Sequence, residues 1–164
     1  MLTTDPARDL FDLEALARRY ADLLDRRLPG PVLVAGFSGG SLLAHALTAE
    51  LVARGREVPA CVLLDPVGVR APRRRVKALA YGLLARTGVR LRPDRATQQR
   101  MATMAVGARR YRPVPVPVPI VVARSVLARP ERWGPLTAAG VTVVDVPGGH
   151  ESMLHPPHAG GVGR

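Results

Sequence analysis

Apolar and polar residues follow a pattern that predicts helices and buried strands in turn. Residues 12–27 carry apolar side chains at helical spacing, with Asp12 as a candidate N-cap, and Pro-Gly-Pro at 29–31 ends this helix. Residues 32–36 form a short, wholly apolar run, which is typical of a strand covered on both faces. Helical periodicity then resumes over residues 39–54.

Three further strands are predicted, a buried one at 60–65 and two more at 119–125 and 141–146. Helices alternate with strands through short links in the first part of the chain, and this order indicates a parallel sheet with right-handed crossovers. We therefore expect an α/β fold, with a mostly parallel sheet of about four strands and flanking helices.

The middle of the chain interrupts this alternation. Residues 70–110 are basic, and they predict two or three helices, around 73–86 and 94–108. The stretch RPVPVPVP at 112–119 predicts a stiff, extended segment that leads into the next strand.

Composition narrows the class of protein. A chain of 164 residues with 47% hydrophobic content is large enough for one domain with a real core. No apolar run is long enough to span a bilayer, and the first ten residues lack the features of a secretory signal. A single cysteine, Cys61, excludes an internal disulfide, so we expect a cytoplasmic protein with no membrane partner.

The net charge of +11 does not by itself indicate a nucleic-acid partner. All but one of the 24 basic residues are arginines, and aromatic residues make up only 4% of the chain, so no base-stacking platform accompanies the charge. The densest basic stretch, RAPRRRVK at 70–77, is a candidate docking patch for an acidic partner, and the alternative is an ordinary solvated face.

A serine between glycines stands where the first strand is predicted to become a helix. Gly36, Ser38 and Gly40 match the pattern G-x-S-x-G, which places a serine hydroxyl above a parallel sheet on a strained turn. Both glycines are expected to let the strand and helix backbones approach. Gly39 N–H would then face the oxygen that becomes negative in acyl transfer. The alternative is a glycine-rich turn with an inert serine.

A nucleophilic serine needs a base, and the chain contains four histidines. His150 directly follows a predicted strand in VPGGH, where two glycines form a loop that can reach over the sheet, so it is the candidate base. His45 lies two turns inside the helix and is expected to pack, while His155 and His158 lie in a proline-rich tail and are expected to be solvated.

The base needs an acid to orient it, and Asp65 is the best candidate. It ends the strand after the serine's strand, and adjacent parallel strands end at the same edge of a sheet. Asp145 lies within a strand and is expected to turn away, and the loop after 119–125 has no acid until Glu131. The alternative for Asp65 is a helix cap or a loop charge.

Three stretches together resemble the thioesterase domains of polyketide and nonribosomal peptide synthases, within the α/β-hydrolase superfamily. They are LVAGFSGGSLLAHALTAELVARGREVPACVLLDPVG, VPIVVARS and VPGGHESML. The resemblance implies Ser38 as nucleophile, His150 as base, Asp65 as orienting acid and Gly39 as an oxyanion donor. It also implies an acyl chain carried on the phosphopantetheine arm of an acyl or peptidyl carrier protein, with no metal or redox cofactor.

The resemblance also implies a single domain over residues 1–164 with a lid at about 70–112, truncated at its N-terminus. The family has further strands before residues 12–27, and a loop among them supplies the second oxyanion donor. Without these strands, residues 32–36 become an open hydrophobic edge, which a second copy or another chain would cover.

Three functions remain open at this stage. The chain is a working thioesterase that acts as hydrolase or cyclase, a catalytically weak remnant that at most binds a carrier protein, or a general serine esterase.

Overall fold

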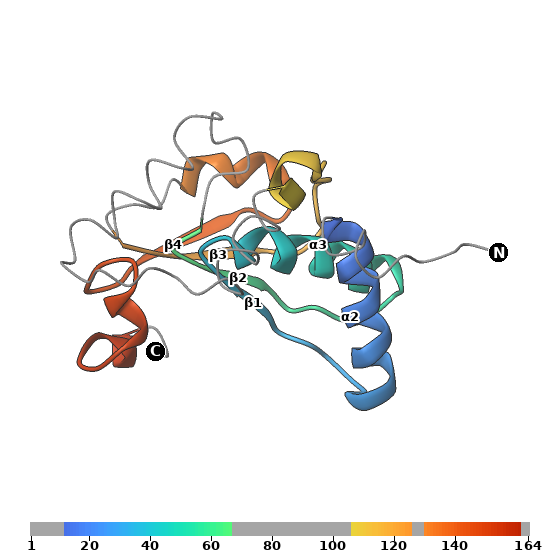
Figure 1. Cartoon of the computed structure of the whole chain (residues 1–164), viewed down its shortest axis with the longest axis horizontal. Coiled ribbons are helices and arrows are strands. Elements are labelled where there is room, and N and C mark those ends of the chain that lie inside the picture. The colour runs from blue at the N-terminus through green and yellow to red at the C-terminus, as the bar shows by residue number, and fades with distance from the viewer. Residues whose placement is uncertain (1–11, 67–105, 126–129, 162–164) are drawn as a thin grey trace.

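The computed structural model describes residues 12–66, 106–125 and 130–161, and it joins four strands into one parallel sheet (Figure 1). The strand order is that of the chain, β1-β2-β3-β4. This arrangement confirms the predicted α/β fold with a parallel sheet of about four strands. The elements are α2 (Leu13–Arg27), β1 (Val34–Phe37), α3 (Gly40–Ala53), β2 (Cys61–Leu64), β3 (Ile120–Arg124) and β4 (Val141–Asp145), with short 3₁₀ turns at Pro130–Arg132, Gly134–Leu136, Ser152–Leu154 and His158–Gly161.

The predicted middle region overlaps the described residues only in part. Residues 106–110 are helical, which agrees with the end of the helix expected around 94–108. The helix expected at 73–86, the basic stretch 70–77 and most of the lid at 70–112 lie outside the described residues. The single domain over the whole chain therefore stays a prediction.

Helix α2 begins where its sequence predicts. The Asp12 carboxylate accepts a hydrogen bond from the N–H of Ala15 at 3.0 Å, which satisfies a donor that the helix start would otherwise leave unpaired. The small side chains of Ala17 and Ala21 are buried in the main core, and this allows α2 to pack closely against α3. Neither α2 nor any other helix in the described part of the chain is long and apolar enough to cross a membrane.

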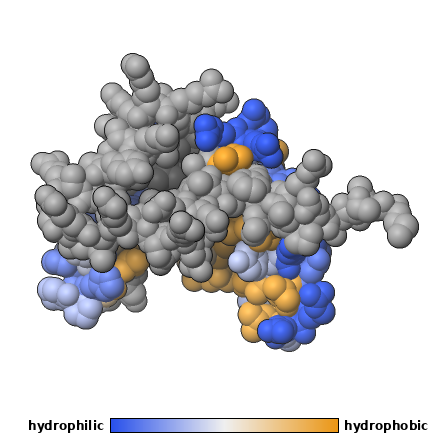
Figure 2. Space-filling model, in the orientation of Figure 1, coloured by the Kyte–Doolittle hydropathy of each residue, from blue (hydrophilic) through white to orange (hydrophobic). Residues whose placement is uncertain are grey.

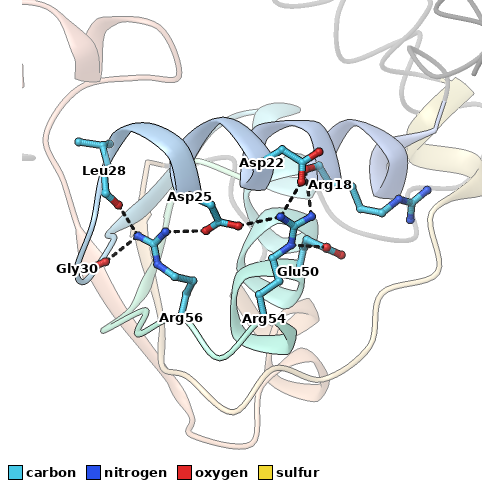
Figure 3. Close-up of polar contacts among 8 residues, drawn as sticks. All are labelled: Arg18, Asp22, Asp25, Leu28, Gly30, Glu50, Arg54 and Arg56. Carbon is cyan, nitrogen blue, oxygen red and sulfur yellow. Dashed lines mark hydrogen bonds and ion pairs between the residues drawn. The ribbon is translucent and has the colours of Figure 1, made fainter.

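An arginine network fastens the end of α3 to α2 (Figure 3). Arg54 donates hydrogen bonds to Asp22 and Asp25 of α2 at 2.7 and 2.9 Å, and to Glu50 one turn back at 2.8 Å. Arg56 reaches Asp25 at 2.7 Å and two carbonyl oxygens in the turn after α2. Exposed ion pairs contribute little to stability one by one. Asp25 nevertheless accepts from both arginines, so the network joins α2 to the end of α3 through several linked bonds.

The main core lies between α3 and one face of the sheet. Alternate residues of the two central strands, Cys61 and Leu63 of β2 and Ile120 and Val122 of β3, are fully buried there. Burial raises the pKa of the Cys61 thiol to about 11, so the thiol acts as a small core side chain and is not reactive.

His45 belongs to this core, as the sequence predicts. Its Nε2 lies 3.2 Å from the carbonyl oxygen of Leu136, and its Nδ1 lies 2.7 Å from the hydroxyl of Tyr111. Because a carbonyl can only accept, Nε2 carries the proton and Nδ1 accepts from Tyr111. Burial lowers the pKa of His45, which keeps the ring neutral beside Trp133.

A second, smaller cluster lies at the carboxyl ends of the strands, apart from the main core. Its buried members are Ala123, Val146 and Met153, and Phe37 and Leu64 pack against them. Met153 comes from the C-terminal turns, which lie at this end of the sheet (red in Figure 1). The C-terminal segment is therefore packed beside the ends of β1, β2 and β3.

One edge of the sheet is open within the described residues, because β1 pairs with β2 alone. Leu33, just before the strand, is 63% exposed, and Ala35 is also exposed. The prediction that the run 32–36 is covered on both faces is thus wrong for the described structure, and the expected hydrophobic edge is present. No Asp, Glu, Lys or Arg occurs between Arg27 and Glu50 to discourage pairing there. Figure 2 shows further hydrophobic surface beside hydrophilic surface at the lower end of α2.

This edge predicts self-association. An exposed strand with unpaired N–H and C=O groups and no charged guard pairs readily with another strand. We expect Leu33→Lys to lower the association of the purified chain in sedimentation velocity over a range of concentrations. Leu28→Lys is the matched control, because Leu28 is 53% exposed but lies at the end of α2, outside the strand.

If the two substitutions lower association equally, the added surface charge is the cause and not the change at the strand edge. A wild-type chain that stays monomeric at every concentration would contradict the prediction.

Candidate active site

The turn between β1 and α3 holds Ser38 in a strained backbone conformation. Its φ of 52° lies in the left-handed region, which non-glycine residues rarely adopt. Ser38 N–H donates to the carbonyl of Leu64 at 2.9 Å, and Ser38 C=O accepts from Ser41 N–H at 3.2 Å. These bonds tie the turn to β2 on one side and to the start of α3 on the other. Ser38 therefore stands at the carboxyl edge of the sheet.

The two glycines of the pattern have different functions. A Cβ atom on Gly36 would lie 2.6 Å from the carbonyl oxygen of Gly40 and 2.7 Å from the Cβ of Ala44, so only glycine lets β1 approach α3 this closely. A Cβ on Gly40 would meet nothing within 4 Å. The expectation that both glycines serve the close approach is therefore correct for Gly36 and wrong for Gly40, whose backbone is what Gly36 approaches.

The start of α3 presents a free donor next to the serine. Gly39 is the N-cap of α3, and the first turn carries no acidic side chain. Among the described residues, no acceptor takes the N–H of Gly39. The N-terminus of a helix carries a partial positive charge, so this N–H favours a negative oxygen.

Asp65 follows β2 and is almost fully buried, with 2% of its surface exposed. Its φ of 43° is the second left-handed value of a non-glycine residue among those described. Its Oδ1 accepts from the N–H of Ser125 at 3.0 Å. Burial works to raise the pKa of Asp65, but hydrogen bonds from His150 and from Ser125 outweigh it, so the pKa lies below its ordinary value. Asp65 is therefore a buried carboxylate that stays ionised at neutral pH.

His150 connects the two residues. Its Nδ1 lies 2.6 Å from Asp65 Oδ2, and its Nε2 lies 2.9 Å from Ser38 Oγ. Because an ionised carboxylate can only accept, Nδ1 carries the proton and Nε2 accepts the serine hydroxyl. The structure thus brings together all three residues that the sequence singles out, in the order serine, imidazole, carboxylate.

Sequence reasoning missed three neighbours of this arrangement. Phe37 stacks on the imidazole of His150, with ring centroids 4.8 Å apart and planes at 28°. Ser125 holds Asp65, and the hydroxyl of Ser152 accepts from the backbone N–H of the loop glycine before His150 at 2.8 Å. The position of Phe37 immediately before the serine was an available signal. The other two follow only from loop geometry.

The remaining candidates take no part in this hydrogen-bonded arrangement. Asp145 is exposed and pairs with Arg124 at 2.7 Å, as expected for a residue that turns away. His155 is exposed and His158 is half-buried, and neither bonds to Ser38. Within the described ranges, no three His, Cys, Asp or Glu side chains gather in a way that could hold a metal ion.

A strained serine after a parallel strand, bonded through an imidazole to a buried carboxylate, defines the chain as an α/β-hydrolase fold with a serine-hydrolase type of site. The family model "Thioesterase domain" matches residues 3–111. The chain therefore belongs to the thioesterase domain family.

A related protein belongs to a polyketide synthase system. The "Spectinabilin polyketide synthase system protein NorC" of Streptomyces orinoci is 32% identical over 161 residues, and the match covers 90% of this chain. This chain spans only 7% of that protein's length.

Solved thioesterases share the fold. The NocB thioesterase domain, solved as a covalent complex with a fluorophosphonate nocardicin G analogue, superposes with a TM-score of 0.68 at 23% identity, and the match covers 92% of this chain and 70% of that one. The surfactin thioesterase domain SrfTE gives 0.67 at 22%, with 89% and 72% covered. The RedJ thioesterase of Streptomyces coelicolor gives 0.66 at 22%, with 90% and 64% covered.

The close approach at Gly36 predicts unequal effects of two alanine substitutions. Gly36→Ala forces the backbones of β1 and α3 apart, and we expect it to destabilise the fold by about 1–3 kcal/mol. Gly40→Ala adds a methyl group in open space at the start of a helix, so we expect it to be neutral or stabilising by up to about 1 kcal/mol. Urea unfolding of both variants measures the difference, and equal free energies would contradict it.

The lowered pKa of Asp65 predicts a loss of stability in acid. A carboxyl whose folded-state pKa lies below its unfolded value stabilises the fold above the unfolded value, and this stabilisation is lost as the pH falls through the folded value. We expect Asp65→Asn to be less stable than wild type from pH 5 to 7, with a gap that closes below roughly pH 4.

The control is Asp145→Asn, which removes an exposed paired carboxylate and should show a much smaller gap, because exposed ion pairs are screened by solvent. Unfolding by denaturant at each pH measures both. A gap for Asp65→Asn that does not change with pH would show that the carboxylate charge is not responsible.

Proposed function

We propose that the chain is a thioesterase that releases an acyl chain, polyketide or peptide, from a carrier-protein phosphopantetheine thioester by Ser-His-Asp acyl transfer. The observation that carries the proposal is the continuous path from Ser38 Oγ through the His150 imidazole to Asp65, with donor–acceptor distances of 2.9 and 2.6 Å. The family supports the reaction class, and the synthase origin of its relatives supports the substrate class.

In the first half of the reaction, Ser38 Oγ attacks the thioester carbonyl carbon while its proton moves to His150 Nε2. The new C–O bond gives a tetrahedral intermediate with a negative oxygen, which the free N–H of Gly39 stabilises. Asp65, ionised at neutral pH, holds the imidazole in the required tautomer and stabilises its positive charge. The C–S bond then breaks, and the thiol leaves with the proton from His150.

In the second half, water or a hydroxyl or amine of the acyl chain itself attacks the ester carbonyl of acylated Ser38. His150 takes the proton of the attacking group and returns it to Ser38 Oγ as the acyl chain departs. Attack by water gives the free acid, and attack by the chain's own group gives a ring. These steps need the serine, the histidine and the aspartate, and we propose that no metal or redox cofactor takes part.

Two partners follow from the proposal. The first is an acyl or peptidyl carrier protein or domain, which brings the thioester on its phosphopantetheine arm. The second covers the open edge of β1, either as a second copy of the chain or as another chain, because an exposed apolar strand edge favours pairing. We propose no nucleic-acid or membrane partner.

Turnover of an acyl-N-acetylcysteamine thioester tests the function. We expect Ser38→Ala and His150→Ala to lower kcat/KM by about a thousandfold or more, because each removes a member of a group that acts as a unit. His155→Ala is the matched control for the histidine, since His155 is exposed and does not hydrogen-bond to Ser38, and its rate should equal that of wild type.

The other outcomes separate the competing functions. Background rates in wild type and Ser38→Ala alike would sink the thioesterase and favour a module that only binds carrier proteins. Faster turnover of a p-nitrophenyl ester than of a carrier-bound thioester with the same acyl chain would favour a general serine esterase.

A further inference from the structure

The loop that carries His150 has little stiffness of its own. Two glycines precede the histidine, and Gly148 has a φ of 94°. Glycine leaves the backbone many accessible conformations. Local bonds fix the backbone of the loop, since Gly149 N–H donates to Ser152 Oγ at 2.8 Å and Gly149 C=O accepts from Met153 N–H at 3.0 Å. These bonds hold the backbone of the loop but do not touch the side chain of His150. The orientation of the imidazole depends on what the ring itself contacts.

Two hydrogen bonds alone do not set the plane of this ring. They leave from Nδ1 and Nε2, toward Asp65 and Ser38. A tilt of the ring about an axis that passes through Nδ1 and crosses the line between the two partner atoms changes the donor–acceptor distances little, but it moves Ser38 Oγ out of the imidazole plane and weakens that bond. A third contact, against the face of the ring, is needed to hold the plane.

Phe37 provides that contact. Its ring stacks on His150 at 4.8 Å between centroids with 28° between planes, a geometry typical of offset aromatic pairs. Phe37 is itself fixed, because it ends β1 and packs against the cluster of Ala123, Val146 and Met153. Since Phe37 directly precedes Ser38, the stack joins the base to the backbone of the nucleophile.

We propose that Phe37 is a positioning residue, whose aromatic face holds the imidazole plane of His150 so that Nε2 stays directed at Ser38 Oγ. The inference rests on the proposed function of the Ser38–His150–Asp65 arrangement and deepens it. When the imidazole takes the serine proton, the same face also stabilises the positive ring. Asp65 is the charged group that bonds to His150 in the described structure.

Inactivation by an alkyl fluorophosphonate tests the proposal without any thioester. In this reaction Ser38 Oγ bonds to phosphorus, the P–F bond breaks, fluoride leaves and the serine proton passes to His150. We expect Phe37→Leu, which keeps an apolar side chain but loses the flat face, to react about three- to tenfold more slowly at saturating probe, with half-saturation unchanged. Phe37→Tyr keeps the face and should react within about twofold of wild type.

Leu64→Val is the matched control. It trims a side chain that packs, as Phe37 does, against the cluster of Ala123, Val146 and Met153, and it leaves the stack in place, so it should label at the wild-type rate. A loss in Leu64→Val equal to that in Phe37→Leu would mean that loosening of the cluster is the cause, and would overturn the proposal.

The Nδ1–H proton of His150 gives a second readout that does not depend on reactivity. A proton held between imidazole and carboxylate gives a strongly downfield signal in proton NMR. We expect this signal to broaden through faster exchange with water in Phe37→Leu and to stay sharp in Phe37→Tyr. If Phe37→Leu does not fold, as judged by circular dichroism, the variant Phe37→Met takes its place in both experiments. Methionine is a longer and flexible apolar side chain.

Wild-type labelling and a sharp signal in Phe37→Leu would overturn the proposal. Failure of the proposed thioesterase function would give a different set of results. In that case thioester turnover would not depend on Ser38, while the labelling and the NMR signal would still report on Phe37.

Discussion

The close contact between the end of β1 and the start of α3 is the constraint on which the site depends. Gly36 lets the strand backbone lie against the carbonyl of Gly40, and the chain then reverses at Ser38 with a left-handed φ. A bulkier residue at 36 would force the backbones of β1 and α3 apart at the turn that carries the serine. Because Ser38 N–H bonds to Leu64, the same turn also fixes the distance from the serine to the end of β2.

Asp65, at that end of β2, shows how the fold offsets the cost of burying a charge. Its backbone is also left-handed, and its carboxylate is removed from water. Hydrogen bonds from Ser125 and His150 replace the lost solvent. Ser38 and Asp65 thus hold strained backbones at the ends of neighbouring strands, and the bonds that hold the Asp65 carboxylate come from the residue after β3 and from the loop after β4. Strain concentrated in this way is typical of functional sites.

Much of this arrangement could be predicted from the sequence because it rests on local patterns. Apolar runs, the proline and glycine stops and the rule that parallel strands end together were enough to place β1 to β4, α2 and α3, and to choose Asp65 and His150. What could not be predicted depends on three-dimensional contacts. The stack of Phe37 on His150, the support of Asp65 by Ser125 and the open space beside Gly40 involve neighbours that spacing along the chain does not reveal. The exposure of β1 depends on which strand lies beside it. The apolar run alone predicted a covered strand.

The long separations of the site's hydrogen bonds have a consequence for the order of folding. The bond from Ser38 to His150 joins residues 112 positions apart, and that from Asp65 to His150 joins residues 85 apart. Contacts between such distant segments form late, because chain entropy must be lost before they are made. An intermediate in which β1, β2 and β3 have paired but β4 has not would carry the nucleophile without its base. Chemical competence at Ser38 is therefore a sign that the last strand has docked.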